Sequence, residues 1–311
     1  MYELHRHIEA SLRPSTLVEL ARQCGVRNFK NEEEVRQKFW VTKPLNSLAD
    51  VLDRFVLFQQ VLFSVEILER VACEVVEDAH SEGITALEIR YSPRFASEKS
   101  KIPWENVLRA FQRGLKNGEA KTGIKTGLIC IVSRGEDLGI AHEAIDFAVS
   151  HRDEFLAVDL AGPEVGFPCR LYKEAFRKAT DAGLPVTIHA GEACGPENIW
   201  EAIDLLGARR IGHGVRSIFD KELVKRLARD KILLETCPTS NVITRAVPSW
   251  ADHPLPRLLQ SGVPCSISTD DPGIFGVTMN EEFERCKKGM GMTESEITQA
   301  RLFAQEHSFL L

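Results

Sequence analysis

The chain has 311 residues, 43% of them hydrophobic and 27% charged, and its 39 basic and 45 acidic side chains give a formal net charge of −6. This composition excludes an intrinsically disordered chain, which would combine low hydrophobicity with high net charge. It also argues against a general nucleic-acid-binding protein, because such a protein needs a basic surface for phosphates.

The cysteines and the apolar segments bear on the cellular compartment. None of the eight cysteines stands in a C-x-x-C pair, so neither a zinc ribbon nor a dithiol redox site is indicated. No apolar run approaches the ~20 residues of a membrane span, so no membrane association is expected. The start of the chain, Met1-Tyr2-Glu3-Leu4, lacks the pattern of a signal peptide. We therefore expect a cytoplasmic protein with reduced thiols.

Short β-branched segments alternate with longer helical patterns along the chain. Each predicted strand is apolar and bounded by Gly, Pro, Asp or Ser. The predicted strands are Tyr2–His7, Ile84–Tyr91, Lys125–Val132, Phe155–Leu160, Val186–His189, Arg209–His213, Ile232–Thr236 and Pro264–Thr269. Apolar residues at i, i+3 and i+4 predict helices between them, including Trp104–Lys116, Leu171–Ala182, Ile199–Leu206 and Asp220–Arg229.

Eight strands alternating with helices predict an α/β protein with a (β/α)8 TIM barrel. An open doubly wound sheet would usually show a glycine-rich turn after its first strand, and residues 8–14 contain no glycine. No linker or repeat divides the chain, so residues 1–311 are expected to form a single domain. Helical patterns at Ser15–Gln23, Leu48–Val61 and Val65–Ser81 predict that residues 15–82 form a helical cap, inserted after strand 1 over the barrel mouth.

Four of the nine histidines, His5, His7, His189 and His213, fall at the carboxyl ends of predicted strands. These ends meet on one face of a barrel, where active sites lie. His5 and His7 are two residues apart and share one face of their strand, although two ordinary strand histidines would show the same spacing. The remaining histidines fall in helices or polar loops, where no catalytic role is expected: His80, His142, His151, His253 and His307.

Acidic residues accompany these histidines. Asp270 and Asp271 follow the last strand, where a helix N-cap or a turn before Pro272 is the alternative explanation. Three neutral imidazoles and one carboxylate suit Zn²⁺, which lowers the pKa of a bound water to about 7. Glu192 stands three residues after His189 and is placed to transfer a proton. The pattern predicts attack of a metal-activated hydroxide on an electrophilic carbon.

Five motifs occur in order at the predicted strand ends, and together they resemble the motif set of the adenosine deaminases. The resemblance runs from about residue 2 to about residue 310. The motifs are His5-Arg6-His7, Ala161-Gly162, His189-Ala190-Gly191-Glu192, Gly212-His213-Gly214 and Ser268-Thr269-Asp270-Asp271-Pro272.

The resemblance implies a zinc-dependent hydrolase that converts adenosine and deoxyadenosine to the 6-oxo purine nucleoside (inosine, from adenosine) and ammonia. It implies one Zn²⁺ per chain, held by the residues that match the family's ligands: His5, His7, His189 and Asp270. It also implies a role for each residue near the base: Glu192 protonates purine N1, His213 orients the hydroxide, Asp271 bonds N7, and the backbone amide of Gly162 contacts N3.

Two departures from the family pattern concern the substrate. Glu9-Ala10 stands where adenosine deaminases usually have Asp-Gly, and that Asp reaches the ribose hydroxyls, so Glu9 is a predicted substrate-binding residue. Pro163 replaces an Asp after Ala161-Gly162. Deaminases of free adenine resemble the Glu9 pattern but lack the Arg90-Tyr91-Ser92-Pro93 form, which favours a nucleoside. Aminodeoxyfutalosine, 5′-methylthioadenosine and free adenine remain alternative substrates.

The sequence also bears on two other types of protein. Related hydrolases with two metals bridge them by a lysine at the end of strand four, and 155–162 contain no lysine, so a single metal is predicted. A non-enzymatic purine-binding homologue would be expected to have lost Glu192 or a ligand, and the chain retains them all. The oligomeric state is left open.

Overall fold

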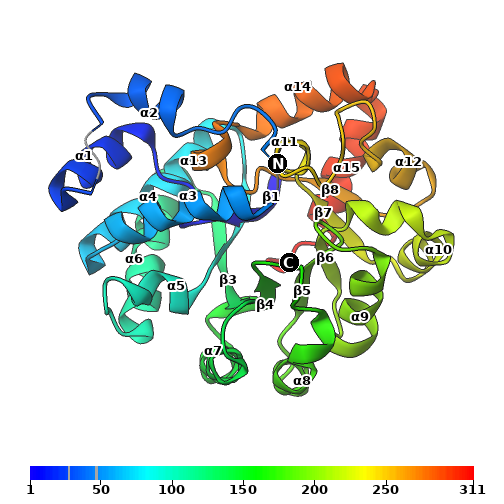
Figure 1. The fold of residues 1–311 in the computed structure, drawn as a ribbon, viewed down its shortest axis with the longest axis horizontal. Helices are drawn as coiled ribbons and strands as arrows, with labels where there is room; N and C mark the ends of the chain where they lie inside the picture. Colours follow the sequence, from blue (N-terminus) through cyan, green and yellow to red (C-terminus); the bar gives the residue numbers. More distant parts are fainter. Residues whose placement is uncertain (27–28, 46–47) are drawn as a thin grey trace.

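Eight parallel strands form a barrel surrounded by helices (Figure 1). The computed structural model describes residues 1–26, 29–45 and 48–311. The strands are hydrogen-bonded in sequence order, from β1 to β8. They are β1 (Tyr2–His7), β2 (Ala86–Tyr91), β3 (Lys125–Ser133), β4 (Phe155–Ala161), β5 (Val186–Ala190), β6 (Arg210–His213), β7 (Leu233–Thr236) and β8 (Cys265–Ile267).

The strands confirm the predicted fold class, and each predicted boundary lies within two residues of the observed one. The largest difference is β8, which was expected over Pro264–Thr269 and has three residues. Beyond it the chain turns to β1: His7 N donates to Asp270 O at 3.0 Å, and Asp270 N donates to His5 O at 2.9 Å. These two bonds join the last strand to the first, so the barrel closes at its carboxyl rim.

Helices occupy the connections between the strands and surround the barrel. The α-helices are α1 (Pro14–Cys24), α2 (Glu32–Lys38), α3 (Leu48–Val61), α4 (Val65–Ser81), α5 (Pro93–Glu98), α6 (Trp104–Thr122), α7 (Leu138–Ser150), α8 (Lys173–Asp181), α9 (Pro196–Leu206), α10 (Lys221–Asp230), α11 (Pro238–Ile243), α12 (Leu255–Gln260), α13 (Pro272–Phe275), α14 (Met279–Met290) and α15 (Glu294–Glu306). Two short 3₁₀ helices are η1 (Cys169–Tyr172) and η2 (Val215–Phe219). Within the described residues, no helix is long and apolar enough to cross a membrane.

Helix α6 extends six residues beyond Lys116, its predicted end, because two glycines in its second half lie against α4. A Cβ at Gly118 would lie 2.5 Å from Val76 Cβ, and one at Gly114 would lie 2.2 Å from Glu69 O. Glycine usually disfavours a helix interior, but here it permits close approach of two helices. The sequence pattern of α6 alone carries no sign of this contact.

The residues expected to form the cap, 15–82, include one helix of the outer ring. That helix is α4, which packs along α6. The segment over the barrel mouth is α3, whose Val51 and Phe55 line the cavity above the strand ends. Helix α1 packs against both α2 and α3 and completes this side of the molecule.

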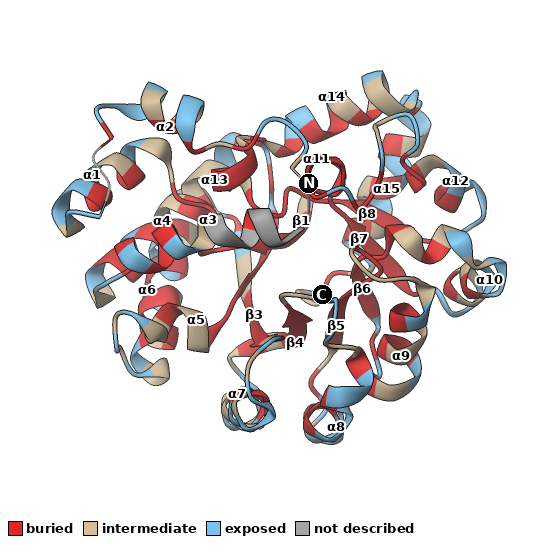
Figure 2. Cartoon of the chain, in the orientation of Figure 1, coloured by how far each residue is buried: buried red, intermediate tan, exposed pale blue. Residues whose placement is uncertain are grey.

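The strands alternate between an apolar outer face and a polar inner face. In β2, Leu87 and Ile89 belong to the apolar core, whereas Glu88 and Arg90 belong to the polar interior, and all four are fully buried. Most of the barrel strands are coloured as buried in Figure 2. Period-two alternation sends neighbouring residues to opposite sides of a sheet, so these charges point into the barrel. The interior beneath the strand ends is therefore a charged network instead of the usual layers of Val, Ile and Leu.

Candidate active site

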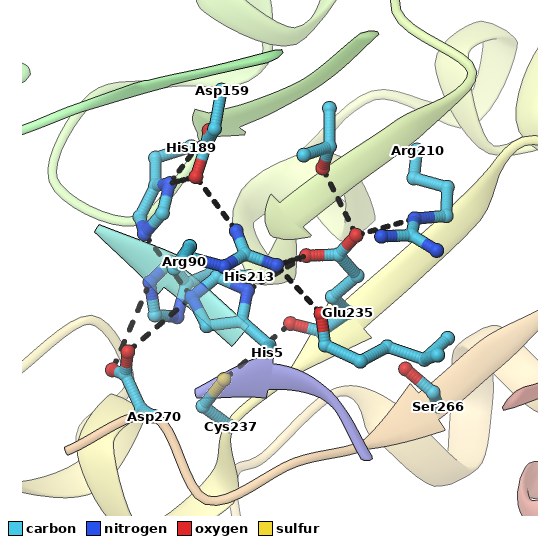
Figure 3. A network of polar contacts seen from close by, with 12 residues as sticks. His5, Arg90, Asp159, His189, Arg210, His213, Glu235, Cys237, Ser266 and Asp270 are labelled. Atoms are coloured by element: carbon cyan, nitrogen blue, oxygen red, sulfur yellow. Dashed lines mark hydrogen bonds and ion pairs between the residues drawn. The ribbon is translucent and has the colours of Figure 1, made fainter. Parts of the chain in front are cut away.

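Four buried side chains bring their ligand atoms together at the carboxyl rim. His5 and His7 come from β1, His189 comes from β5, and Asp270 follows β8. Figure 3 shows three of them, His5, His189 and Asp270. His189 Nε2 lies 3.1 Å from His5 Nε2 and 3.3 Å from His7 Nε2. Asp270 Oδ1 lies 3.3 Å from His5 Nε2 and 3.3 Å from His7 Nε2. The structure thus brings together the four residues that the sequence proposed as metal ligands.

Buried carboxylates hold the other ring nitrogens of two of these histidines. His5 Nδ1 lies 2.7 Å from Glu235 Oε2, and His189 Nδ1 lies 3.0 Å from Asp159 Oδ1. Arg90 joins the two carboxylates, at 2.7 Å from Asp159 and 2.8 Å from Glu235. Burial alone would raise the pKa of both acids, but their cationic partners outweigh it and hold both pKa values well below the usual range. Both groups are therefore ionised acceptors.

The donor atoms of this arrangement suit a cation. Because the Nδ1 atoms of His5 and His189 donate to carboxylates, each ring in its neutral form carries a lone pair on Nε2, and the two Nε2 atoms face each other. Four ligand atoms placed tetrahedrally at Zn–N distances would lie about 3.3 Å apart, which matches the spacing observed here. The donor set of three imidazoles and one carboxylate therefore fits a zinc ion.

The histidine pKa values agree with this assignment at two positions. Burial lowers the pKa of His7 and of His189, so both rings are neutral and offer lone pairs at neutral pH. At His5, burial and Arg90 lower the pKa, but Asp270 and Glu235 raise it by more. A proton and a metal ion therefore compete for His5 Nε2, as is general for metal-binding imidazoles.

Two non-glycine residues at the rim have a left-handed backbone. His213 and Asp270 both have φ of +62°. Such conformations cost free energy in β-carbon-bearing residues and cluster at functional sites. Next to His213, a Cβ at Gly212 would lie 2.9 Å from His5 Cε1, so glycine leaves the space that the His5 ring occupies.

The loop that carries Glu192 is held by a residue that the sequence did not reveal. The buried carboxylate of Glu164 accepts hydrogen bonds from four consecutive backbone N–H groups, at 2.7 to 3.2 Å, in residues 191–194. It also accepts one from Asn198 Nδ2 at 2.9 Å. Glu164 follows Pro163, so the carboxylate at this turn lies one residue after the position where the family pattern has Asp.

The Glu192 side chain faces the metal-ligand cluster. Its Oε2 lies 3.5 Å from His213 Nε2, and its Oε1 accepts a hydrogen bond from Thr244 Oγ1 at 3.0 Å. Burial, with the nearby charge of Asp270, raises the pKa of Glu192 to about 8. Protonated Glu192 can therefore act as an acid at neutral pH.

Asp271 does not act as a helix cap. It stands at the N-cap position of α13 but makes no side-chain cap bond, and its Oδ1 is buried without a partner among the described residues. Burial raises the pKa of Asp271 well above its ordinary value, and Asp270 and Glu192 add to the effect. The N-cap explanation is thus wrong, and Asp271 presents an unused polar atom at the site.

Two adjoining cavities lie above these residues and share His7, Phe55, Ala161 and Gly162. The inner one, about 50 Å³, is also lined by His189, Glu192, His213, Asp270 and Asp271. The outer one, about 260 Å³, is also lined by Glu9, Ser92, Phe95, Ile131, Ser133, Arg134 and Glu136. Every residue that the sequence proposed for the site lines one of these cavities, except His5, which lies beneath the inner one in contact with His189.

Glu9 and Gly162 occupy the outer cavity in different ways. Glu9 Oε1 accepts a hydrogen bond from Ser92 N at 2.7 Å, and burial raises the pKa of Glu9 to about 8. Gly162 has φ of +106°, a conformation that requires glycine. Gly162 lines both cavities and presents no side chain to either.

Several residues of the site escaped the sequence reasoning. One signal could have revealed three of them, because Arg90, Asp159 and Glu235 are charged residues inside otherwise apolar barrel strands. A charge at such a position must point inward and find partners. No comparable pattern marks Glu164 or Thr244, whose roles depend on how the loops fold back.

Comparison with known proteins extends these observations to the whole chain. The family model of adenosine deaminase matches residues 1–311. The adenosine deaminase of Shigella flexneri is 38% identical over 309 residues, which cover 99% of this chain and 93% of that protein.

Solved structures are also similar over 99% of this chain. Adenine deaminase from Arthrobacter aurescens has a TM-score of 0.91 at 30% identity, with 93% of that chain covered. A zinc-bound amidohydrolase from Burkholderia ambifaria has a TM-score of 0.90 at 27% identity and 85% coverage. Arabidopsis ADAL in complex with IMP has a TM-score of 0.85 at 29% identity and 91% coverage.

Proposed function

The chain belongs to the adenosine deaminase family and is a hydrolytic purine deaminase, and we propose that it converts adenosine and deoxyadenosine to the 6-oxo nucleosides and ammonia, with one zinc ion per chain. The observation that carries this proposal is the convergence of His5, His7, His189 and Asp270 at tetrahedral spacing. When bound, zinc would supply a Lewis acid that lowers the pKa of a water to about 7.

The residues around this centre are assigned to different atoms of the purine and to the attacking oxygen. We assign Glu192 the delivery of a proton to N1, which makes C6 electrophilic, and its raised pKa supports that role. Because N7 accepts hydrogen bonds, the protonated form of Asp271 favoured by burial is suited to donate to it. The backbone amide of Gly162 is assigned to N3. His213 is assigned the stabilisation of charge that develops on the attacking oxygen.

The outer cavity supports a nucleoside over a free base. A purine held between Glu192 and Asp271 leaves the outer cavity for the sugar. In that cavity one carboxyl oxygen of Glu9 accepts a hydrogen bond from Ser92 N. We propose that the second oxygen of Glu9 binds a ribose hydroxyl. Free adenine would leave this cavity to water and lose those contacts.

The acidic lining of the outer cavity disfavours a 5′-phosphate. Its lining includes the carboxyl groups of Glu9 and Glu136, whereas Arg134 turns its guanidinium toward Leu160 O at 3.3 Å and Cys169 Sγ at 3.3 Å. Arg94 is paired with Glu136 at 2.9 Å. No free cation is thus offered to a phosphate by the described lining, in contrast to what nucleotide recognition requires.

An adenine nucleoside with an uncharged 5′ substituent is the second candidate. Phe55, Phe95 and Ile131 give the outer cavity an apolar wall. Such a wall suits a 5′-methylthio group or the extended 5′ substituent of aminodeoxyfutalosine better than it suits a hydroxyl.

The discriminating experiment compares kcat/KM, by ultraviolet absorbance, for adenosine, deoxyadenosine, adenine, AMP, methylthioadenosine and aminodeoxyfutalosine. The proposal expects adenosine and deoxyadenosine to exceed both adenine and AMP. A higher value for methylthioadenosine or aminodeoxyfutalosine would select the second candidate. A higher value for adenine or AMP would refute a nucleoside site, and no conversion of any of the six would refute the reaction.

A further inference from the structure

A chain of three buried side chains leads from a helix end to His213. Its members are His253, Asn241 and His213, which are 3%, 0% and 1% exposed. His253 precedes α12, Asn241 lies in α11, and His213 ends β6. None of these positions is a metal ligand in the arrangement described above, and the sequence pattern gave His253 no role.

The direction of the hydrogen bonds is fixed at the first link. Leu255 N lies 3.2 Å from His253 Nδ1. A backbone N–H can only donate, so His253 Nδ1 must be the acceptor and carry no proton. Burial also lowers the pKa of His253 to about 3, so the ring is neutral and its single proton sits on Nε2.

The remaining links follow from the first. His253 Nε2–H donates to Asn241 Oδ1 at 3.3 Å, which orients the amide so that Nδ2 faces His213 Nδ1 at 3.0 Å. Asn241 Nδ2 is a donor, so His213 Nδ1 accepts and carries no proton. An imidazole ring keeps at least one N–H, so with Nδ1 bare His213 must hold its proton on Nε2.

The other tautomer of His213, with its proton on Nδ1, is disfavoured by the same hydrogen bonds. If His213 carried its proton on Nδ1, the Asn241 amide would have to turn and present Nδ2 to His253. His253 would then need its proton on Nδ1, directly against the N–H of Leu255. Two donors would face each other in a buried site, which costs about 1–3 kcal/mol for the unsatisfied groups.

We propose that Asn241 and His253 are positioning residues that lock His213 in its Nε2–H tautomer, so that His213 acts in the site as a neutral hydrogen-bond donor and not as a base. The Nε2 atom points into the site, 3.5 Å from Glu192 Oε2 and 4.0 Å from Asp270 Oδ2. The catalytic use of this proton rests on the proposed deamination, whereas the tautomer itself does not.

The direct test is ¹⁵N NMR of the histidine ring nitrogens in the zinc-loaded protein, since protonated and bare nitrogens differ strongly in shift. His213 and His253 resonances are assigned by their loss in single-histidine variants. Both rings are expected to show a bare Nδ1 and a protonated Nε2. A protonated Nδ1 on His213 would overturn the proposal, whatever the activity of any variant.

Substitution provides the second test. In Asn241→Asp a carboxylate oxygen faces His213 Nδ1, so that nitrogen should become protonated, and kcat should fall by about 10²- to 10³-fold, as when an oxyanion donor is lost. KM should change little, because no substrate contact is removed. A folded variant with wild-type kcat, or with His213 Nδ1 still bare, would refute the lock.

A pair of variants at the far end of the chain separates the lock from simple packing. His253→Gln keeps an acceptor and a donor and should retain kcat near wild type, whereas His253→Phe fills the space without either and should lower it. His151→Gln is the matched control, because His151 is partly buried and bonded to Glu105 away from the site. Equal activity of the Gln and Phe variants would contradict the lock. Purine turnover by the wild type is measured separately. If the wild type shows no deamination, the proposed function fails, but the NMR measurement still tests the tautomer of His213.

Discussion

Asp159→Asn is the most informative perturbation of the metal site, because it changes one atom beneath the ligands. Asp159 Oδ1 accepts from His189 Nδ1 at 3.0 Å, and Asp159 Oδ2 accepts from Arg90 at 2.7 Å. The asparagine amide has a single oxygen for these two donors. Arg90 carries a full charge and forms the stronger bond, so the oxygen should turn to Arg90 and the NH₂ group to His189.

This flip acts on the metal through the tautomer of His189. With an N–H group facing Nδ1, the ring must keep its proton on Nε2, the atom that faces the other ligands. Loss of a carboxylate partner behind a metal-binding histidine typically costs 10–100-fold in metal affinity, which is about 1.4–2.7 kcal/mol. Arg90 keeps its contacts with Glu235 at 2.8 Å and with Leu4 O at 2.7 Å, so its charge stays paired. Global stability should therefore fall by less than the about 3–5 kcal/mol of a fully broken buried pair.

The assay is competition for Zn²⁺ between the protein and a chromophoric chelator, with urea unfolding measured in parallel. Asp146→Asn is the matched control, since Asp146 makes an exposed pair with Lys178 at 2.7 Å and its loss should change stability by about 0.5 kcal/mol or less. If Asp159→Asn bound zinc as tightly as the control, His189 would not depend on Asp159, and the assignment of the ligand set would fail.

Three further predictions follow from the structure. Glu192→Gln should retain zinc and the fold but lower kcat by about 10²–10⁴-fold through loss of the proton donor, and steady-state kinetics near wild type would exclude Glu192 from proton transfer. Gly118→Leu should destabilise the protein by about 1–3 kcal/mol in urea unfolding, because its side chain would overlap Val76, whereas an unchanged midpoint would mean that α4 and α6 can separate freely. Burial holds the pKa of His253 in the folded protein at about 3, while the unfolded value is 6.5, so between these pH values only the unfolded chain takes up this proton and the stability of the fold decreases as the pH falls. The loss of unfolding free energy between pH 6.5 and 3 should therefore be smaller in His253→Gln than in the wild type. An equal loss in both proteins would contradict the buried neutral ring.

The sequence was informative wherever local pattern decides structure. Strands were found because β-branched runs alternate with helical patterns, and the histidines were found because they stand at strand ends. The extension of α6 was missed because Gly118 is favourable only when Val76 lies opposite. Likewise, the lock on His213 depends on Asn241 and His253, which come together only when α11 folds back over β6. Contacts between distant segments of this kind have no local signature.

The charge of the barrel interior gives an independent reason for one divalent cation. Ion pairs link the ligand cluster to Glu235 and Asp159, and both of these to Arg90 (Figure 3). Glu235 is linked in turn through Arg210 to Glu88. Together with Asp270, the residues named here comprise four carboxylates and two guanidiniums, an excess of two negative charges. Glu192 adds no charge while it is protonated, and His213 is neutral. Buried charges are costly unless balanced, so a single ion of charge +2 at the ligand cluster completes this network. A second metal ion would leave the same interior with an uncompensated positive charge, which is why we expect metal analysis to give one zinc per folded chain.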